Sequence, residues 1–162
     1  MGRYRRETKA ALATLTVLAL AGPALAAAPP QADYHPSMAD RMTMAIQPRH
    51  TKIGLAGRLR NWTYLAFEAS ELRNAFGRIV RTIPVYSQTD TAEMINPMVK
   101  ELLATLEAAI KAKDARAFDA AYAKLTETCN TCHSTQSKAF IVIKAPEASN
   151  YPDQDFRAQP GK

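Results

Sequence analysis

Five residues in the last quarter of the chain, Cys129-Asn130-Thr131-Cys132-His133, constrain its fold and chemistry more than any other feature. Two cysteines three positions apart lie on the same side of a helical turn. Their thiols can form thioether bonds with the two vinyl groups of one porphyrin, and the imidazole of the adjacent His133 then lies under the iron. The spacing therefore predicts one covalently attached haem c, held by Cys129 and Cys132, with His133 as the proximal ligand of the iron.

Other chemistry open to a C-x-x-C pair fits the rest of the sequence less well. Cys129 and Cys132 are the only cysteines, and no H-x-x-x-H pattern occurs, so a zinc ribbon lacks its second pair of ligands. A thioredoxin-like dithiol is expected after a strand of a βαβ unit, whereas this motif lies late in a helix-forming segment. A redox-active dithiol or a disulfide stays as the alternative to haem attachment.

The N-terminus predicts export. A basic stretch precedes an apolar run from Ala10 to Leu20, and Ala24-Leu25-Ala26 fits the small-x-small pattern that signal peptidase cleaves. We therefore interpret residues 1–26 as a signal peptide and expect a periplasmic protein. A membrane anchor is the competing interpretation, but the apolar run is interrupted by Gly22-Pro23 and is shorter than the roughly 20 residues that a span needs. No stable membrane insertion is expected after cleavage.

The charge of the chain gives no support to a nucleic-acid partner. The formal net charge is +6, but residues 1–26 contain four basic side chains and one acidic one, so the mature chain carries +3. Two haem propionates would offset most of that charge, and no strong basic field remains to attract nucleic acid. About 136 residues remain after cleavage, enough for one domain with a single core.

Prolines, capping residues and helical periodicity predict an all-α fold within residues 37–145. Residues 27–36 are rich in proline and are interpreted as a flexible leader. Residues 146–162 are interpreted as an extended tail, with Tyr151 and Phe156 as its expected anchors. Four helices are expected, at residues 37–47, 48–82, 96–113 and 114–133.

Two prolines are expected to set helix boundaries. Pro48 restricts the residue before it, so the first helix is expected to stop at Gln47 and the second to begin at Pro48. Asn96-Pro97 has the pattern of a second cap followed by proline, and Asp114 is expected to cap the last helix. Apolar side chains at three- and four-residue steps predict the buried seam of the second helix: Leu55, Leu59, Trp62, Ala66, Ala69, Phe76, Val80 and Ile83.

Four helices with the C-x-x-C-H motif on the last of them resemble the cytochrome c′ family and related four-helix-bundle cytochromes. In ordinary small cytochromes c the motif lies near the N-terminus instead. The resemblance covers residues 37–138, and Cys129, Cys132 and His133 match the haem-binding residues of the family one for one. It implies a four-helix bundle of the cytochrome c′ type. The tail after Lys144 is longer than the family pattern, and no other position is matched.

The motif does not determine the second axial ligand of the iron. In the four-helix cytochromes the N-terminal helices line that face of the haem, so the resemblance directs attention to the histidines and methionines of that part of the chain. His50 is our first candidate, because His35 lies in the expected leader, a poor place from which to hold a metal. A thioether ligand and no protein ligand at all are the alternatives. The thioether candidates are Met38, Met42 and Met44.

Two glycines follow His50 on the same helix face, Gly54 at i+4 and Gly57 at i+7. Each costs about 1 kcal/mol relative to alanine in a helix, so a pair on one face indicates that something bulky approaches closely. A porphyrin and a neighbouring helix both fit this pattern.

These features predict a non-enzymatic electron carrier that exchanges single electrons with redox partner proteins. The alternative is a five-coordinate haem protein that binds a small gas such as nitric oxide, which the resemblance to cytochromes c′ implies. Weak peroxidase activity would need a distal acid–base group, a role that His50 could serve if it stood off the iron. The sequence does not determine whether the protein forms a homodimer.

The first prediction concerns export. Mass spectrometry of the periplasmic fraction should give a mature N-terminus close to Ala27, because Ala24 and Ala26 present the small side chains that signal peptidase requires. A membrane-bound, haem-loaded protein that retains Met1 would show that the segment is an anchor.

Overall fold

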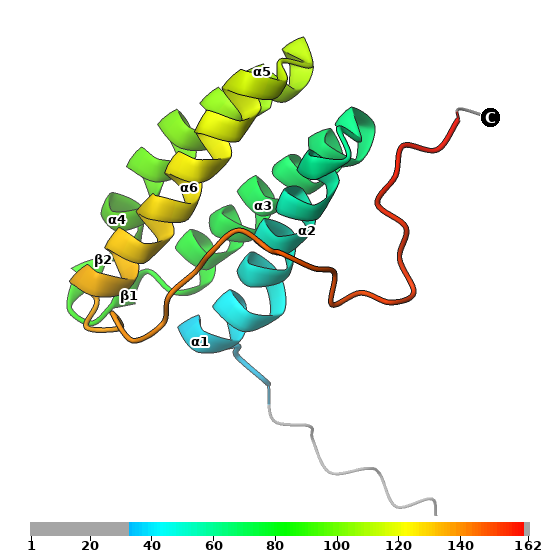
Figure 1. The fold of residues 1–162 in the computed structure, drawn as a ribbon. Coiled ribbons are helices and arrows are strands. Elements are labelled where there is room, and N and C mark those ends of the chain that lie inside the picture. The colour runs from blue at the N-terminus through cyan, green and yellow to red at the C-terminus, as the bar shows by residue number, and fades with distance from the viewer. Residues whose placement is uncertain (1–32, 161–162) are drawn as a thin grey trace, which may run out of the picture. The chain divides into compact units, whose positions relative to one another are not determined.

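The computed structural model describes residues 33–160, and this part of the chain is all-α, with four helical segments and one short hairpin (Figure 1). The expected signal peptide and residues 27–32 of the expected leader lie outside the described residues. The elements are α1 (Met38–Arg41), η1 (Met42–Ile46), α2 (Gln47–Arg58), α3 (Trp62–Thr82), β1 (Val85–Tyr86), β2 (Thr89–Asp90), α4 (Thr91–Met98), η2 (Val99–Leu103), α5 (Ala104–Ala112) and α6 (Ala115–Thr135).

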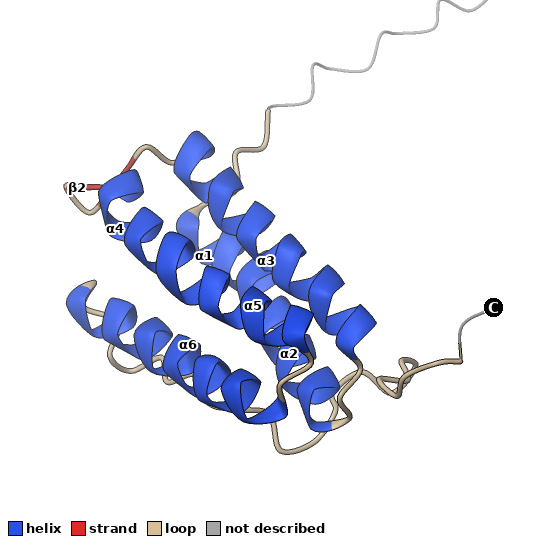
Figure 2. Ribbon diagram, turned by 90° about the horizontal axis from the view of Figure 1, so that it is seen from above, coloured by secondary structure: helices blue, strands red, loops and turns tan. Residues whose placement is uncertain are grey.

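The first helical segment joins α1, η1 and α2 without a break. The second is α3, the third joins α4, η2 and α5 without a break, and the fourth is α6. The first segment packs on α3, α3 packs on α5, and α5 packs on α6 (Figure 2). β1 and β2 form an antiparallel hairpin between α3 and α4, with Tyr86 paired to Thr89. Within residues 33–160, no helix combines the length and the apolar content that crossing a membrane requires.

The last helix follows its expected range closely. Asp114 caps α6, because its carboxylate accepts hydrogen bonds from the backbone N–H groups of Arg116 and Ala117. Phe118, Tyr122 and Leu125 then recur at helical spacing and are buried. The helix continues through the C-x-x-C-H motif to Thr135, so the motif occupies its last two turns.

The predicted boundary at Pro48 is wrong. The first segment runs from Met38 through Pro48 to Arg58, and the chain turns at residues 59–61 instead. The turn before Pro48 is a π-helix, η1, in which the N–H of Gln47 donates to the carbonyl of Met42. This wider turn relieves the clash that a proline ring makes with the carbonyl four residues earlier, so the helix continues past the proline.

The predicted helix start at Asn96-Pro97 is also wrong. α4 begins at Thr91 and is capped by Asp90, whose carboxylate accepts hydrogen bonds from the N–H groups of Ala92 and Glu93. Pro97 lies inside α4, and the π-helix η2 begins two residues after it. Both interior prolines therefore adjoin a π-turn.

The predicted apolar seam is correct only in part. The turn at residues 59–61 divides the expected helix into α2 and α3, so the buried positions of the two helices do not follow one continuous repeat. Leu55, Ala69 and Phe76 are buried as expected, whereas Leu59 and Ala66 are exposed. The side chains that α3 buries form a stripe of their own: Leu65, Glu68, Ala69, Leu72, Ala75, Phe76 and Ile79.

The two glycines of α2 face α6. An added Cβ at Gly57 would collide with the Phe118 ring, and one at Gly54 would collide with the Tyr122 hydroxyl and, at 2.6 Å, with the Pro146 ring. The bulky group that the glycines accommodate is therefore a neighbouring helix and the tail, so the alternative of clearance for a porphyrin does not explain them.

Residues 136–160 form neither helix nor strand and cross α2 and α3 on their way to the C-terminus (Figure 1). Phe156 is 5% exposed and packs edge-on against Tyr64 of α3. The side-chain amide of Asn61 donates to the carbonyls of Phe156 and Arg157. These contacts fasten the tail over the turn between α2 and α3.

The second prediction tests the packing of α2 on α6. Gly57→Ala should lower the free energy of unfolding by about 1–3 kcal/mol, because the new methyl group overlaps the Phe118 ring. Gly77→Ala is the matched control, since its methyl group would meet only the flexible end of Arg81, and it should raise stability by about 0.5–1 kcal/mol. Urea denaturation of both variants measures the two effects; equal effects would contradict the close packing.

Candidate functional site

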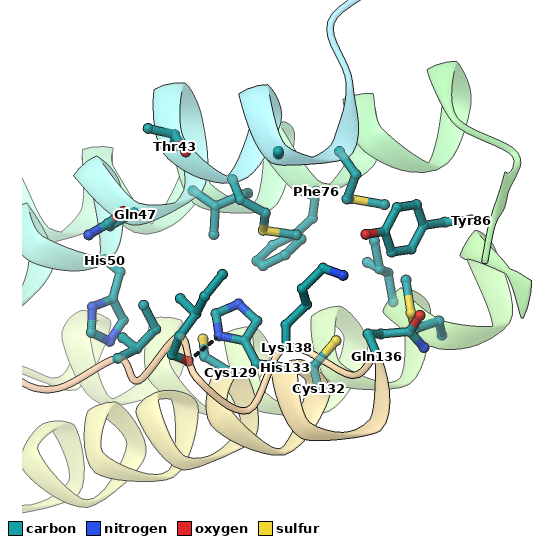
Figure 3. A pocket seen from close by; sticks show the side chains of 18 of the residues that line it. Thr43, Gln47, His50, Phe76, Tyr86, Cys129, Cys132, His133, Gln136 and Lys138 are labelled. Carbon is teal, nitrogen blue, oxygen red and sulfur yellow. Dashed lines mark hydrogen bonds between the residues drawn. The ribbon is translucent and has the colours of Figure 1, made fainter.

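The C-x-x-C-H motif lines a cavity of about 190 Å³ between the first segment, α4 and the end of α6 (Figure 3). Most of the lining side chains are apolar, which is typical of cofactor and small-molecule sites. Four of the six methionines in the chain line it: Met38, Met42, Met94 and Met98. The volume is below the roughly 300–1,000 Å³ of common ligand pockets, so a macrocycle would have to displace flexible lining side chains.

His133 is oriented by a hydrogen bond from its ring. Its Nδ1 lies 2.9 Å from the carbonyl oxygen of Ile141, which can only accept, so Nδ1 carries the proton. In the neutral ring with this tautomer, Nε2 carries the lone pair, which is the form of histidine that binds a metal. A hydrogen bond of this kind to the second ring nitrogen is a common feature of metal-binding histidines, because it fixes the ring and its tautomer.

The surroundings of the cysteines disfavour a thiolate. Burial raises the pKa of the Cys129 thiol to about 11 and also raises the pKa of Cys132. The pair lies in the last turns of α6, where the helix dipole opposes negative charge. A redox-active dithiol needs the opposite, a lowered pKa of the kind found at helix N-termini. The environment therefore argues against dithiol chemistry and is compatible with thiols that serve as attachment points.

The chain turns back after α6 and closes one side of the cavity. We call residues 137–146 the return segment. Its Lys138, Ile141 and Ile143 line the cavity, and the Lys138 side chain extends into it beside His133 (Figure 3). The exposed neighbours Phe140 and Val142 alternate with the lining residues, as expected for an extended chain.

His50 also lines the cavity but is held by hydrogen bonds. Its Nε2 lies 2.8 Å from the Thr126 hydroxyl, which itself donates to the Tyr122 carbonyl, so Nε2–H donates to Thr126. Its Nδ1 lies 3.3 Å from the Tyr122 hydroxyl. Burial lowers the pKa of His50 to about 4, so the ring is neutral at pH 7. The Tyr122 hydroxyl has one proton and donates at the shorter distance of 3.0 Å to the backbone carbonyl of His50, so the bond to Thr126 is the main restraint on the ring. Nε2 could bind iron only if that bond were released.

The other candidate ligands are divided between the cavity and the surface. Met38 and Met42 line the cavity, whereas Met44 is 67% exposed and His35 is exposed in the residues before α1. The sequence analysis missed Met94 and Met98, which face the cavity from α4. Their i, i+4 spacing was a usable signal, but the helix was expected to begin only at Asn96.

Comparisons with protein-family models, curated proteins and solved structures find no match to this chain. Among residues 33–160, no group of three or more histidine, cysteine, aspartate or glutamate side chains is placed to hold a metal ion. The functional argument therefore depends on the geometry of the motif and its cavity.

The third prediction concerns pH. His50 is neutral in the folded protein down to about pH 4, whereas in the unfolded chain it takes up a proton near pH 6.5. The unfolded state binds more protons between these values, so stability falls as the pH falls through this window, by up to about 3 kcal/mol. His50→Gln should remove this dependence while its amide can still donate to Thr126. Urea denaturation at pH 7 and pH 5 tests the difference, and parallel pH profiles of the two proteins would contradict it.

Proposed function

We propose that this protein is an exported monohaem c-type cytochrome of the cytochrome c′ type that carries single electrons between redox partner proteins. The observation that supports the proposal most is His133: its Nδ1 donates to a backbone carbonyl, and its side chain lines the same apolar cavity as Cys129 and Cys132. This donor set matches a covalently attached haem in number, type and spacing.

The residues of the motif would hold the cofactor in two different ways. Cys129 and Cys132 would be the thioether attachment points, and His133 Nε2 would be the proximal ligand. The haem supplies the one-electron chemistry of its iron. The chain contributes an apolar surrounding that limits water and thereby favours the less charged ferrous form.

The cavity offers thioether groups for the sixth position of the iron. Met38 and Met42 approach from the first segment, and Met94 and Met98 from α4. A thioether ligand raises the reduction potential and keeps the iron six-coordinate in both oxidation states, which suits an electron carrier. His50 remains the histidine candidate, subject to release of the Thr126 bond.

A specific observation favours a second candidate function. Nε2 of His50 donates to Thr126, and the Tyr122 hydroxyl holds the backbone carbonyl of the same residue, so the ring is already fixed by contacts within the protein. Without a methionine in its place, the iron would be five-coordinate, and the apolar cavity would admit a small uncharged gas such as nitric oxide. For both candidate functions we propose a periplasmic location, no enzymatic turnover, and action as a monomer or homodimer.

The fourth prediction tests the cofactor. Thioether bonds survive denaturation, so haem should stay with the polypeptide in acidified organic solvent after expression with a haem-attachment system. Cys129→Ala combined with Cys132→Ala should abolish this retention, whereas Thr131→Ala, at an exposed position of the same motif, should not. Free extraction of haem from the wild-type chain would refute the proposal.

The fifth prediction separates the two functions by spin state. An electron carrier with a protein ligand should be low-spin and bind carbon monoxide slowly in the ferrous form. Loss of the ligand should make it high-spin and quick to bind the gas, so the responsible side chain is found by comparing Met38→Ala, Met42→Ala, Met94→Ala, Met98→Ala and His50→Ala. A wild-type protein that is already high-spin would move the assignment to gas binding.

A further inference from the structure

Asn130, the first variable residue of the motif, is bonded to the return segment through both ends of its amide. Its Nδ2 donates to the carbonyl of Ile143 at 2.8 Å, and its Oδ1 accepts from the N–H of Ile143 at 2.7 Å. The amide thus offers one backbone residue both the acceptor and the donor that a neighbouring β-strand would offer.

The second bond between α6 and the return segment is the one that orients His133. Asn130 and His133 are three residues apart on α6, so they lie on the same face of the helix. Their partners, Ile143 and Ile141, are two residues apart in an extended chain, so their polar backbone groups point in the same direction. Two side chains of the motif therefore hold two alternate residues of one extended segment.

The return segment has little else to fix it at this point. It contains no helix or strand. The N–H of Ile141 donates to the Lys138 carbonyl at 2.8 Å, whereas the carbonyl of Ile141 and both polar backbone groups of Ile143 depend on side chains of α6 for their partners. Phe140 and Val142 are 79% and 73% exposed, so their side chains contribute little burial. The bidentate bond of Asn130 is the stronger restraint, because it satisfies a donor and an acceptor of the same residue.

We propose that Asn130 is a positioning residue for His133: it clamps Ile143 and thereby holds the Ile141 carbonyl against Nδ1 of the proximal histidine. This inference rests on the proposed function, since it assigns His133 to the iron. Donation of a hydrogen bond from Nδ1–H to a carbonyl makes Nε2 a stronger electron donor. Stronger donation stabilises the ferric state, so the clamp lowers the reduction potential of the haem.

The test compares the two variable positions of the motif in the haem-loaded protein. Asn130→Ala should shift the reduction potential upward and lower the iron–histidine stretching frequency of a five-coordinate ferrous form. Thr131→Ala is the matched control, because Thr131 is exposed and its hydroxyl bonds to the Glu127 carbonyl within the same helix. It should leave both quantities unchanged. A merely structural role for Asn130 would lower stability without moving the potential.

A second variant removes the clamp from its other end. Ile143→Pro lacks the N–H that donates to Asn130, leaves the motif intact, and should shift the potential in the same direction as Asn130→Ala. Ile143→Pro provides the test if Asn130→Ala does not fold. Wild-type potentials in both variants would overturn the proposal.

A separate readout distinguishes failure of the clamp from failure of the proposed function. Nitrogen NMR of His133 reports which ring nitrogen carries the proton, and it can be recorded whether or not the chain carries haem. If the wild type attaches no haem, the proposed function fails. The proposed role of Asn130 is then supported if Nδ1 of His133 carries its proton in the wild type and in Thr131→Ala but loses it in Asn130→Ala. It is overturned if the protonation of Nδ1 is the same in all three proteins. If haem is attached and Asn130→Ala matches the wild type, only the clamp fails.

Discussion

The close packing of α2 on α6 determines where the cavity can form. Gly54 and Gly57 let α2 approach the aromatic side chains of α6 at one end of the two helices. Toward the other end, residues of the first segment and residues of the C-x-x-C-H motif line the two sides of the same cavity. A helix pair in tight contact at one end and separated at the other leaves an apolar space beside the motif. The Gly57–Phe118 contact therefore lies in the same helix pair that lines the cavity further along.

A network of hydrogen bonds around one buried carboxylate lies away from the cavity. The buried carboxylate of Glu68 is paired with Arg49 at 3.0 Å and accepts from the Tyr64 hydroxyl at 2.8 Å. Burial, together with Glu68, raises the pKa of Tyr64 to about 12, so it stays a donor. Gln154 of the tail donates to the same hydroxyl at 2.6 Å. This network joins α2, α3 and the tail, and the buried carboxylate is tolerated because both of its oxygens have hydrogen-bond partners.

The sequence predicted what depends on local spacing and missed what depends on distant contacts. Helical class, the cap at Asp114 and the placement of the motif on the last helix follow from patterns within a few turns of chain. The run from Phe140 to Ile143 is too short for a strand to stand alone, and the structure shows that Ile141 and Ile143 bond to side chains of a helix instead. The glycine pair indicated close approach correctly, but only the structure identifies Phe118 and Tyr122 as the groups that approach.

The π-turn behind the error at Pro48 also bears on the site. An α-helix has 3.6 residues per turn, so side chains four apart drift by about 40° at each step, and Met38 and His50, three steps apart, would lie about 120° apart. Met38, Met42, Ile46 and His50 nevertheless all line the cavity. The π-turn of η1 holds more residues per turn and takes back part of that drift. The same wider turn that lets Pro48 remain inside the helix thus keeps Met38, Met42 and His50 on one face, toward the cysteines and histidine of α6.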